Sequence, residues 1–78
     1  MSFFNSHNYR NAAAVTPSDT ADNTGSAIYV GGAGNVVVDT ETGQTVTFTA
    51  PPVGAILPIR VVRVRATGTT ATNLLRLW

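Results

Sequence analysis

The segment QTVTFTA, residues 44–50, alternates apolar and polar side chains without a break. In an extended chain, Val46 and Phe48 point to one side and the intervening threonines point to the other. Such alternation is typical of a strand in a sheet with one face on a core and the other in water. The segment therefore predicts a β fold and sets the pattern to look for in the rest of the chain.

Four other apolar segments surround this strand, and the turn sequences GGAGN, ETGQ, PPVGA and GTTA separate the segments. Glycine accepts positive φ, and proline interrupts a central ladder, so these sequences end strands. Short strands at a spacing of about ten residues predict an all-β fold, a small antiparallel β-sandwich or barrel of about five strands. The expected strands are residues 26–30, 35–40, 44–50, 56–67 and 72–78.

The expected strand at residues 56–67 contains three arginines, Arg60, Arg63 and Arg65, between apolar residues. Strict alternation would leave neither of its faces consistently apolar. One extra residue near Val61–Val62, a β-bulge, shifts the parity of the side chains and separates the two kinds of residue. The arginines then point outward, and the core-facing residues are Ile59, Val61, Val62, Val64 and Ala66.

Three outward arginines on one strand need partners. They could simply lie in water with their stems over apolar neighbours, or they could belong to a subunit interface, where arginine pairs with carboxylates. Asp39 and Glu41 are the available acids of the chain near the second strand. The apolar end NLLRLW, residues 73–78, also suggests contact with another subunit. The candidate interface residues are Arg60, Arg63, Arg65 and Trp78.

Residues 1–25 form a polar segment with no sustained period, and we expect an extended N-terminal arm before a β domain at residues 26–78. Within the arm, NAAAV at residues 11–15 suggests one helical turn that Pro17 would end. Large aromatic rings favour burial, so the aromatic residues of the arm are candidates for contact with a capsid or a neighbouring subunit. These residues are Phe3, Phe4 and Tyr9.

Composition excludes several classes of function. The 78 residues include no cysteine and one histidine, His7, so neither a disulfide framework nor a thiol- or histidine-ligated metal site is expected. No spacing of acids, bases and nucleophiles indicates catalysis, and no cofactor is predicted. GGAGN is interpreted as a hairpin turn, since the remaining residues of a phosphate-binding loop do not follow it.

The formal net charge of +1 gives little attraction to nucleic acid or to a membrane surface. No apolar run approaches the roughly 20 residues that a membrane span requires, and the start of the chain does not read as a signal peptide. A chain of this size buries only roughly 60% of its unfolded surface. We therefore expect stabilisation by association with other copies.

Four motifs resemble the small spike-base proteins of gene transfer agents and related tailed phages. They are VTPSDTAD at residues 15–22, YVGGAGNV at 29–36, VTFTAPPVGAILPIRV at 46–61 and RATGTTAT at 65–72, and the resemblance extends over residues 13–78. It implies a virion protein on the capsid surface, assembled in the host cytoplasm, that anchors a head fibre. It also implies a homo-oligomer, a pentamer at the capsid vertices, in contact with the major capsid protein and the head fibre protein.

Two other functions stay open at the level of sequence. One is a decoration or cement protein spread over the whole capsid lattice. The other is a sugar-binding module for host recognition, for which the β domain offers Tyr29 and Trp78 as exposed aromatic candidates. Neither alternative, nor the spike base, carries catalytic residues.

Overall fold

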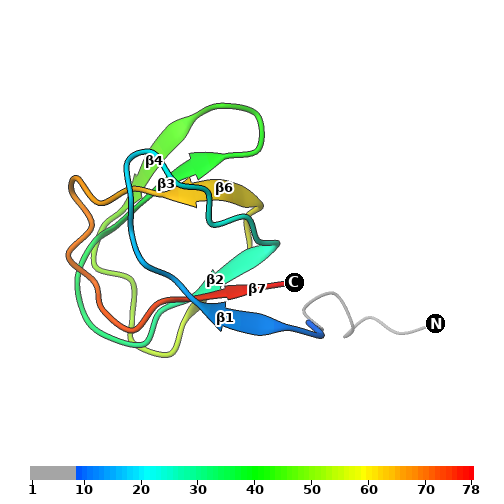
Figure 1. Ribbon diagram of the computed structural model, residues 1–78. Coiled ribbons are helices and arrows are strands. Elements are labelled where there is room, and N and C mark those ends of the chain that lie inside the picture. Colours follow the sequence, from blue (N-terminus) through cyan, green and yellow to red (C-terminus); the bar gives the residue numbers. More distant parts are fainter. Residues whose placement is uncertain (1–8) are drawn as a thin grey trace.

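The computed structural model describes residues 9–78 of the chain, and all regular structure in this range is β (Figure 1). The all-β prediction is confirmed, with two antiparallel sheets that pack as a small sandwich. The seven strands of the described range are β1 (Ala12–Ala14), β2 (Ala27–Tyr29), β3 (Val36–Thr40), β4 (Thr45–Phe48), β5 (Ile56–Leu57), β6 (Val61–Val64) and β7 (Leu75–Leu77).

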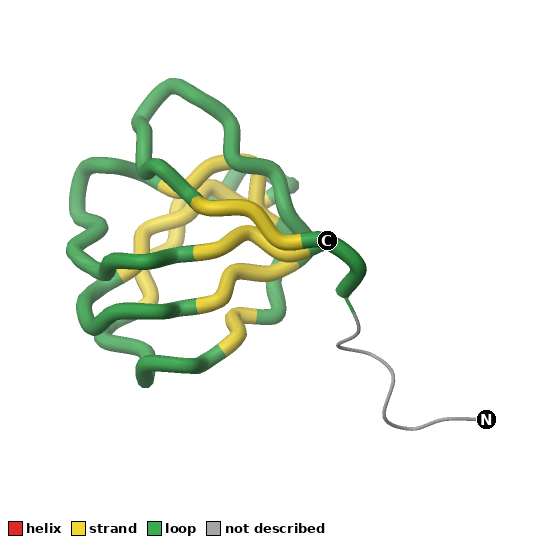
Figure 2. Tube along the Cα trace, turned by 60° about the horizontal axis from the view of Figure 1, so that its bottom comes forward, coloured by secondary structure: helices red, strands yellow, loops and turns green. Residues whose placement is uncertain are grey.

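Sheet A contains four strands in the order β1-β7-β2-β5, and sheet B contains three in the order β4-β3-β6. Every pair of neighbouring strands is antiparallel. In Figure 1, sheet B lies above sheet A, and the chain passes repeatedly between the two layers. Figure 2 turns the bottom of that view forward, so that the four strands of sheet A come towards the reader.

The core lies between the sheets and consists of aliphatic side chains. In the strand at residues 45–48, Val46 and Phe48 pack against the core while the threonines are exposed, as the alternation of QTVTFTA predicts. The same alternation sends Val36 and Val38 of β3 inward. The side chains of the core that are buried completely, or nearly so, are Ile28, Val30, Val36, Val38, Val61 and Val64.

The predicted bulge is confirmed. Val61 of β6 lies opposite Thr40, whereas Arg63 lies opposite Asp39, so Val62 is the extra residue in the pair. The bulge allows Val61 and Val64 to enter the core together, although they are an odd number of residues apart.

Three details of the expected strand at residues 56–67 are wrong. The chain forms two strands instead of one, because Pro58 interrupts the ladder and a tight turn, in which the Ile59 N–H donates to the Leu57 carbonyl at 2.9 Å, carries the chain from sheet A to sheet B. Ala66 is exposed because β6 ends at Val64, and Val62 is only half-buried because it occupies the bulge.

The helical turn expected at residues 11–15 is also wrong. Residues 12–14 form β1, because they pair with β7 at the end of the chain. The following segment runs along the outer edge of β6, where Ser18 donates its N–H to the Val64 carbonyl at 2.9 Å and Asn23 donates to the Val62 carbonyl at 2.9 Å. These backbone hydrogen bonds attach the described part of the predicted arm to both sheets.

The glycine-rich segment at residues 31–34 is a crossover and not the expected hairpin turn, because β2 and β3 belong to different sheets. Gly34 has a φ of 141°, and a Cβ there would collide with the backbone of Thr70 and Ala71. A side chain at Gly32 would collide with Thr72. The glycines therefore let the crossover lie directly against residues 70–72.

Candidate interaction surfaces

The outer face of sheet B carries a cluster of charged side chains around Asp39. The carboxylate accepts a hydrogen bond from the Thr45 hydroxyl at 2.7 Å, from Arg63 Nη1 at 2.9 Å and from Arg65 Nε at 2.9 Å. A second acid, Asp22 from the segment along β6, accepts from Arg63 Nη2 at 3.0 Å. With Asp39 only 6% exposed, its two oxygens are occupied by groups of the same chain.

Hydrogen bonding determines the charge state of this cluster. The Thr45 hydroxyl and then the guanidinium groups of Arg65 and Arg63 lower the pKa of Asp39 from its ordinary value of 3.8, against the opposing effect of desolvation. The reciprocal bond to Asp39 raises the pKa of Arg63. The cluster is therefore ionised at neutral pH and joins β3, β4 and β6.

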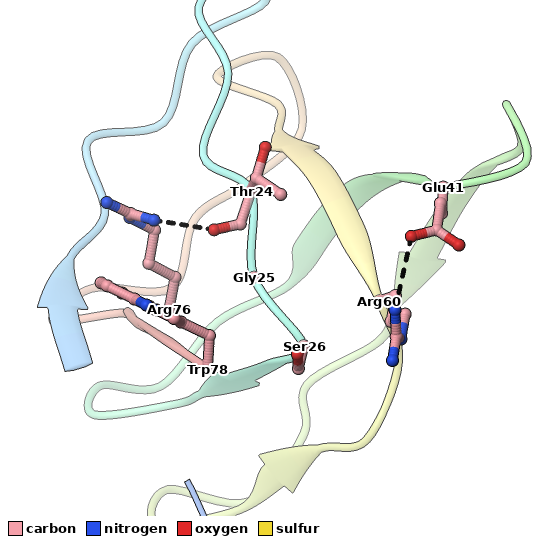
Figure 3. Close-up of a pocket in the computed structure, with 7 residues that line it drawn as sticks. All are labelled: Thr24, Gly25, Ser26, Glu41, Arg60, Arg76 and Trp78. Atoms are coloured by element: carbon pink, nitrogen blue, oxygen red, sulfur yellow. Dashed lines mark hydrogen bonds and ion pairs between the residues drawn. The ribbon is translucent and has the colours of Figure 1, made fainter. Parts of the chain in front are cut away.

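A hollow of about 300 Å³ lies where the two sheets separate at one end of the sandwich (Figure 3). Arg60 and Glu41 come from the sheet B side, and their side chains are 3.8 Å apart and largely exposed. Arg76 and Trp78 come from the sheet A side, with the Arg76 guanidinium 4.3 Å from the centre of the indole ring. The remaining lining residues are Thr24, Gly25 and Ser26.

The outer face of sheet A is apolar. Directly opposed residues of antiparallel strands share a face, so the pairings Ala14–Leu75, Leu75–Tyr29 and Tyr29–Ile56 form one row across the sheet. Because Ile28, the neighbour of Tyr29, lies in the core, this row points away from it. We call this surface the outer strip; it consists of Ala12, Ala14, Tyr29, Ile56, Leu75 and Leu77.

None of the outer-strip residues is charged, and none of them belongs to the core between the sheets. Ile56 is 41% exposed, and the side chains of Tyr29, Leu75 and Leu77 are half-buried. Ala27, in the same row as Leu77, is fully buried. A contiguous apolar surface on a sheet face is typical of a contact with another protein surface.

The structure separates the predicted interface residues into two groups. Arg60 and Trp78 line the same hollow, and Trp78 is 41% exposed. Arg63 and Arg65 lie in the Asp39 cluster, on the outward side of β6 as predicted. Each acid named from the sequence lies beside arginines of the same chain: Asp39 beside Arg63 and Arg65, and Glu41 beside Arg60.

Of the aromatic arm residues, Phe3 and Phe4 lie outside the described residues, and Tyr9 is half-buried. The chain enters sheet A directly after Tyr9, where Arg10 and Asn11 both donate their N–H groups to the Trp78 carbonyl at 2.8 Å. Residues 10 and 11 are therefore held beside Trp78, directly after β7 and at the rim of the outer strip.

Sequence reasoning did not identify the outer strip. Its residues come from four separate segments, and only the strand pairing brings them together. The one available signal was the end NLLRLW, in which large side chains occupy both faces of the expected strand. Within residues 9–78, no group of three metal-ligating side chains forms, and no helix is long and apolar enough to cross a membrane.

Among solved structures, the chain is similar to one described as "Capsid of native GTA particle computed with C5 symmetry". The two chains are 38% identical, the match covers 100% of each, and the TM-score is 0.81. No protein-family model and no curated protein matches the chain. The class of protein is thus a structural component of a capsid, and the chain belongs to the family of this GTA capsid chain.

Proposed function

We propose that the protein is a spike base on the surface of a capsid, where it anchors a head fibre at the five-fold vertices. The observation that carries this proposal is the full-length likeness to a capsid chain whose structure was computed with C5 symmetry. Five-fold symmetry is the symmetry of a capsid vertex, and a pentamer of this chain fits such a site. The protein then belongs to the virion, is assembled in the host cytoplasm and has a structural, non-enzymatic role.

The chemistry of the surfaces supports a role in assembly. The hollow beside Trp78 is an open depression between the sheets, and the acid Asp39 is neutralised by arginines of its own chain. These features suit protein contacts better than the enclosed site of an enzyme. The partners in the proposal are further copies of this chain, the major capsid protein and the head fibre protein.

Two sets of residues make the contacts in this proposal. Phe3, Phe4 and Tyr9 of the arm bind the capsid or a neighbouring copy. Arg60 and Trp78, which are exposed at the hollow, contact the next copy directly, and the Asp39 cluster, which holds Arg63 and Arg65, supports this contact from within the same chain.

A reconstruction of intact particles, with the copies of this protein counted, tests the proposal. Density at the vertices alone, continuous with a fibre, is the expected result. Copies spread over the whole lattice would instead identify a cement protein and overturn the vertex assignment. Particles that bind host glycans through this chain, and lose that binding in a Trp78→Ala variant, would identify a host-recognition module.

Removal of the arm tests the capsid contact separately. Because β1 begins at Ala12, deletion of residues 1–8 leaves all strand pairs of the described structure in place. The truncated protein should fold but no longer decorate particles. Decoration at the normal copy number would exclude Phe3 and Phe4 from the contact.

A further inference from the structure

We propose that the outer strip of sheet A is the docking surface for residues 1–8 of a neighbouring copy, with Phe3 and Phe4 packed on it. This inference rests on the self-association in the proposed function and decides between the two partners that the arm could have. It does not depend on where on a capsid the protein binds.

The first argument is chemical complementarity. The outer strip consists of aliphatic side chains, alanines and one tyrosine, with no charge in its two rows. Residues 1–8 contain three large apolar side chains, Met1, Phe3 and Phe4. Aromatic rings on an aliphatic face bury large apolar areas, so the two surfaces suit each other.

The second argument is reach. Residues 1–8 can extend over at most about 26–29 Å. The four strands of sheet A are spaced by about 4.8 Å, so a chain crosses from β1 to β5 in about 15 Å. The segment also starts in the right place, since Arg10 and Asn11 are fixed to the Trp78 carbonyl at the end of β7. An arm that leaves this rim can therefore cross the outer strip of an adjacent copy.

The third argument concerns which copy receives the arm. Because β1 runs antiparallel to β7, the chain before Ala12 leaves sheet A past Trp78, and residues 1–8 would have to reverse their direction to return over their own sheet. A closed ring also needs two different, complementary surfaces on each subunit. The arm and the outer strip form such a pair, so each copy can give an arm to one neighbour and receive an arm from the other.

The test is a mixing experiment with two defective full-length chains. One carries Phe3→Ala and Phe4→Ala and so has an outer strip but no arm contact. The other carries Ile56→Glu, which places a charge on the outer strip at a position that is 41% exposed and leaves the arm intact. Masses are measured by light scattering after size-exclusion chromatography, at concentrations where the unaltered chain is a multimer.

Each variant alone should shift towards the monomer mass of 8.2 kDa. The loss of one strong contact is expected to raise the dissociation constant about 30-fold or more. An equal mixture of the two variants should form pairs and nothing larger. In each pair, the arm of the Ile56→Glu chain binds the outer strip of the other chain, and no further functional arm or outer strip remains to extend the assembly. The matched control is Thr47→Glu, which adds the same charge at an exposed position on the outer face of sheet B and should leave the multimer intact.

Thermal unfolding of every variant verifies that it is folded, and photo-crosslinking from residue 4 in a mixture of isotopically light and heavy chains gives a second readout. Crosslinks between light and heavy chains at Leu75 or Leu77 support the proposal. Crosslinks confined within single chains would show that the arm covers its own sheet and would overturn it. A multimer that survives in both variants would overturn the proposed docking of the arm as well. So would an unaltered chain that stays monomeric at every concentration. Neither result would contradict decoration of the capsid vertices, which a reconstruction of particles tests separately.

Discussion

The outer faces of the two sheets differ in how far other parts of the same chain cover them and pair with their side chains. On sheet B, Asp39 lies between Arg63, Arg65 and Thr45, and the apolar Val37, which points outward, is covered by the loop at residues 68–69. On sheet A, the outer strip remains partly exposed, since Ile56 is exposed and Tyr29, Leu75 and Leu77 are half-buried. The contrast indicates that the outward-facing groups of sheet B find their partners within one copy, whereas sheet A offers an apolar surface to another copy.

The hydrogen bonds of the loop show how sheet B is closed. Thr69 accepts the N–H of Val37 at 2.9 Å, and the Asp19 carboxylate accepts from the Thr67 N–H at 3.0 Å. Gly68, with a φ of 92°, lies so close to Val37 that a Cβ there would be 3.0 Å from that side chain. Threonine and arginine thus satisfy this face within the chain, and little apolar surface remains for a partner.

The largest expected effect is on the free energy of unfolding, and it separates two isoleucines on adjacent strands of sheet A. Ile28 is fully buried between the sheets, so Ile28→Ala should lower the free energy of unfolding by about 2–5 kcal/mol. Ile56 lies on the outer strip, so Ile56→Ala in a monomeric background should cost less than about 1 kcal/mol. Urea unfolding of both variants measures the difference. Equal losses would mean that the outer strip is buried within a single copy.

A smaller effect is expected for the charged cluster on sheet B. Asp39→Ala removes the common acceptor of Arg63 and Arg65, which leaves the Arg65 guanidinium without its carboxylate and leaves Arg63 with the exposed Asp22 alone. The unfolding midpoint should fall by about 5–10 °C in a domain of this size. The matched control is Asp22→Ala, whose carboxylate is 67% exposed and should matter much less. A similar midpoint for the two variants would contradict the assignment of Asp39 as the centre of the cluster.

The smallest effect is the dependence of stability on pH. The folded-state pKa values of Asp39 and Asp19 lie below the ordinary value of 3.8, in Asp39 chiefly through the Thr45 hydroxyl and in Asp19 through Thr67. The unfolded chain therefore binds protons first as the pH falls. Stability should be constant above about pH 5 and decline as the pH falls below about 4. Asp39→Asn should unfold at a lower midpoint at neutral pH and show a shallower acid decline in thermal scans.

The sequence predicted those elements whose pattern is local. The alternation in residues 44–50 fixed both the strand and its core face, and the parity of residues 59–65 required the bulge found at Val62. β1 was missed because three alanines have no period of their own, and only the pairing with β7 makes them a strand. The crossover at residues 31–34 was mistaken for a hairpin because the sequence does not show that the flanking strands belong to different sheets.

The candidate sites were likewise predicted only where their residues lie in one local pattern of the sequence. The arginines were found because the outward positions of one strand could be counted, and Asp39 and Glu41 were named only as the acids available near the second strand. The pairing of β3 with β6, which brings Asp39 to Arg63, is visible only in the structure. The hollow and the outer strip depend on contacts between distant segments, such as Arg76 beneath Thr24 and Leu75 beside Tyr29. No local pattern in the sequence encodes these neighbours.

The most direct test of the difference between the two faces is hydroxyl-radical footprinting of the full chain at low and at high concentration. If sheet A is completed by another copy, Tyr29, Leu75 and Leu77 should lose reactivity as the protein assembles, while Val37 on sheet B should keep the low reactivity that it has in the monomer. Unchanged reactivity of the sheet A residues in a confirmed multimer would contradict the account.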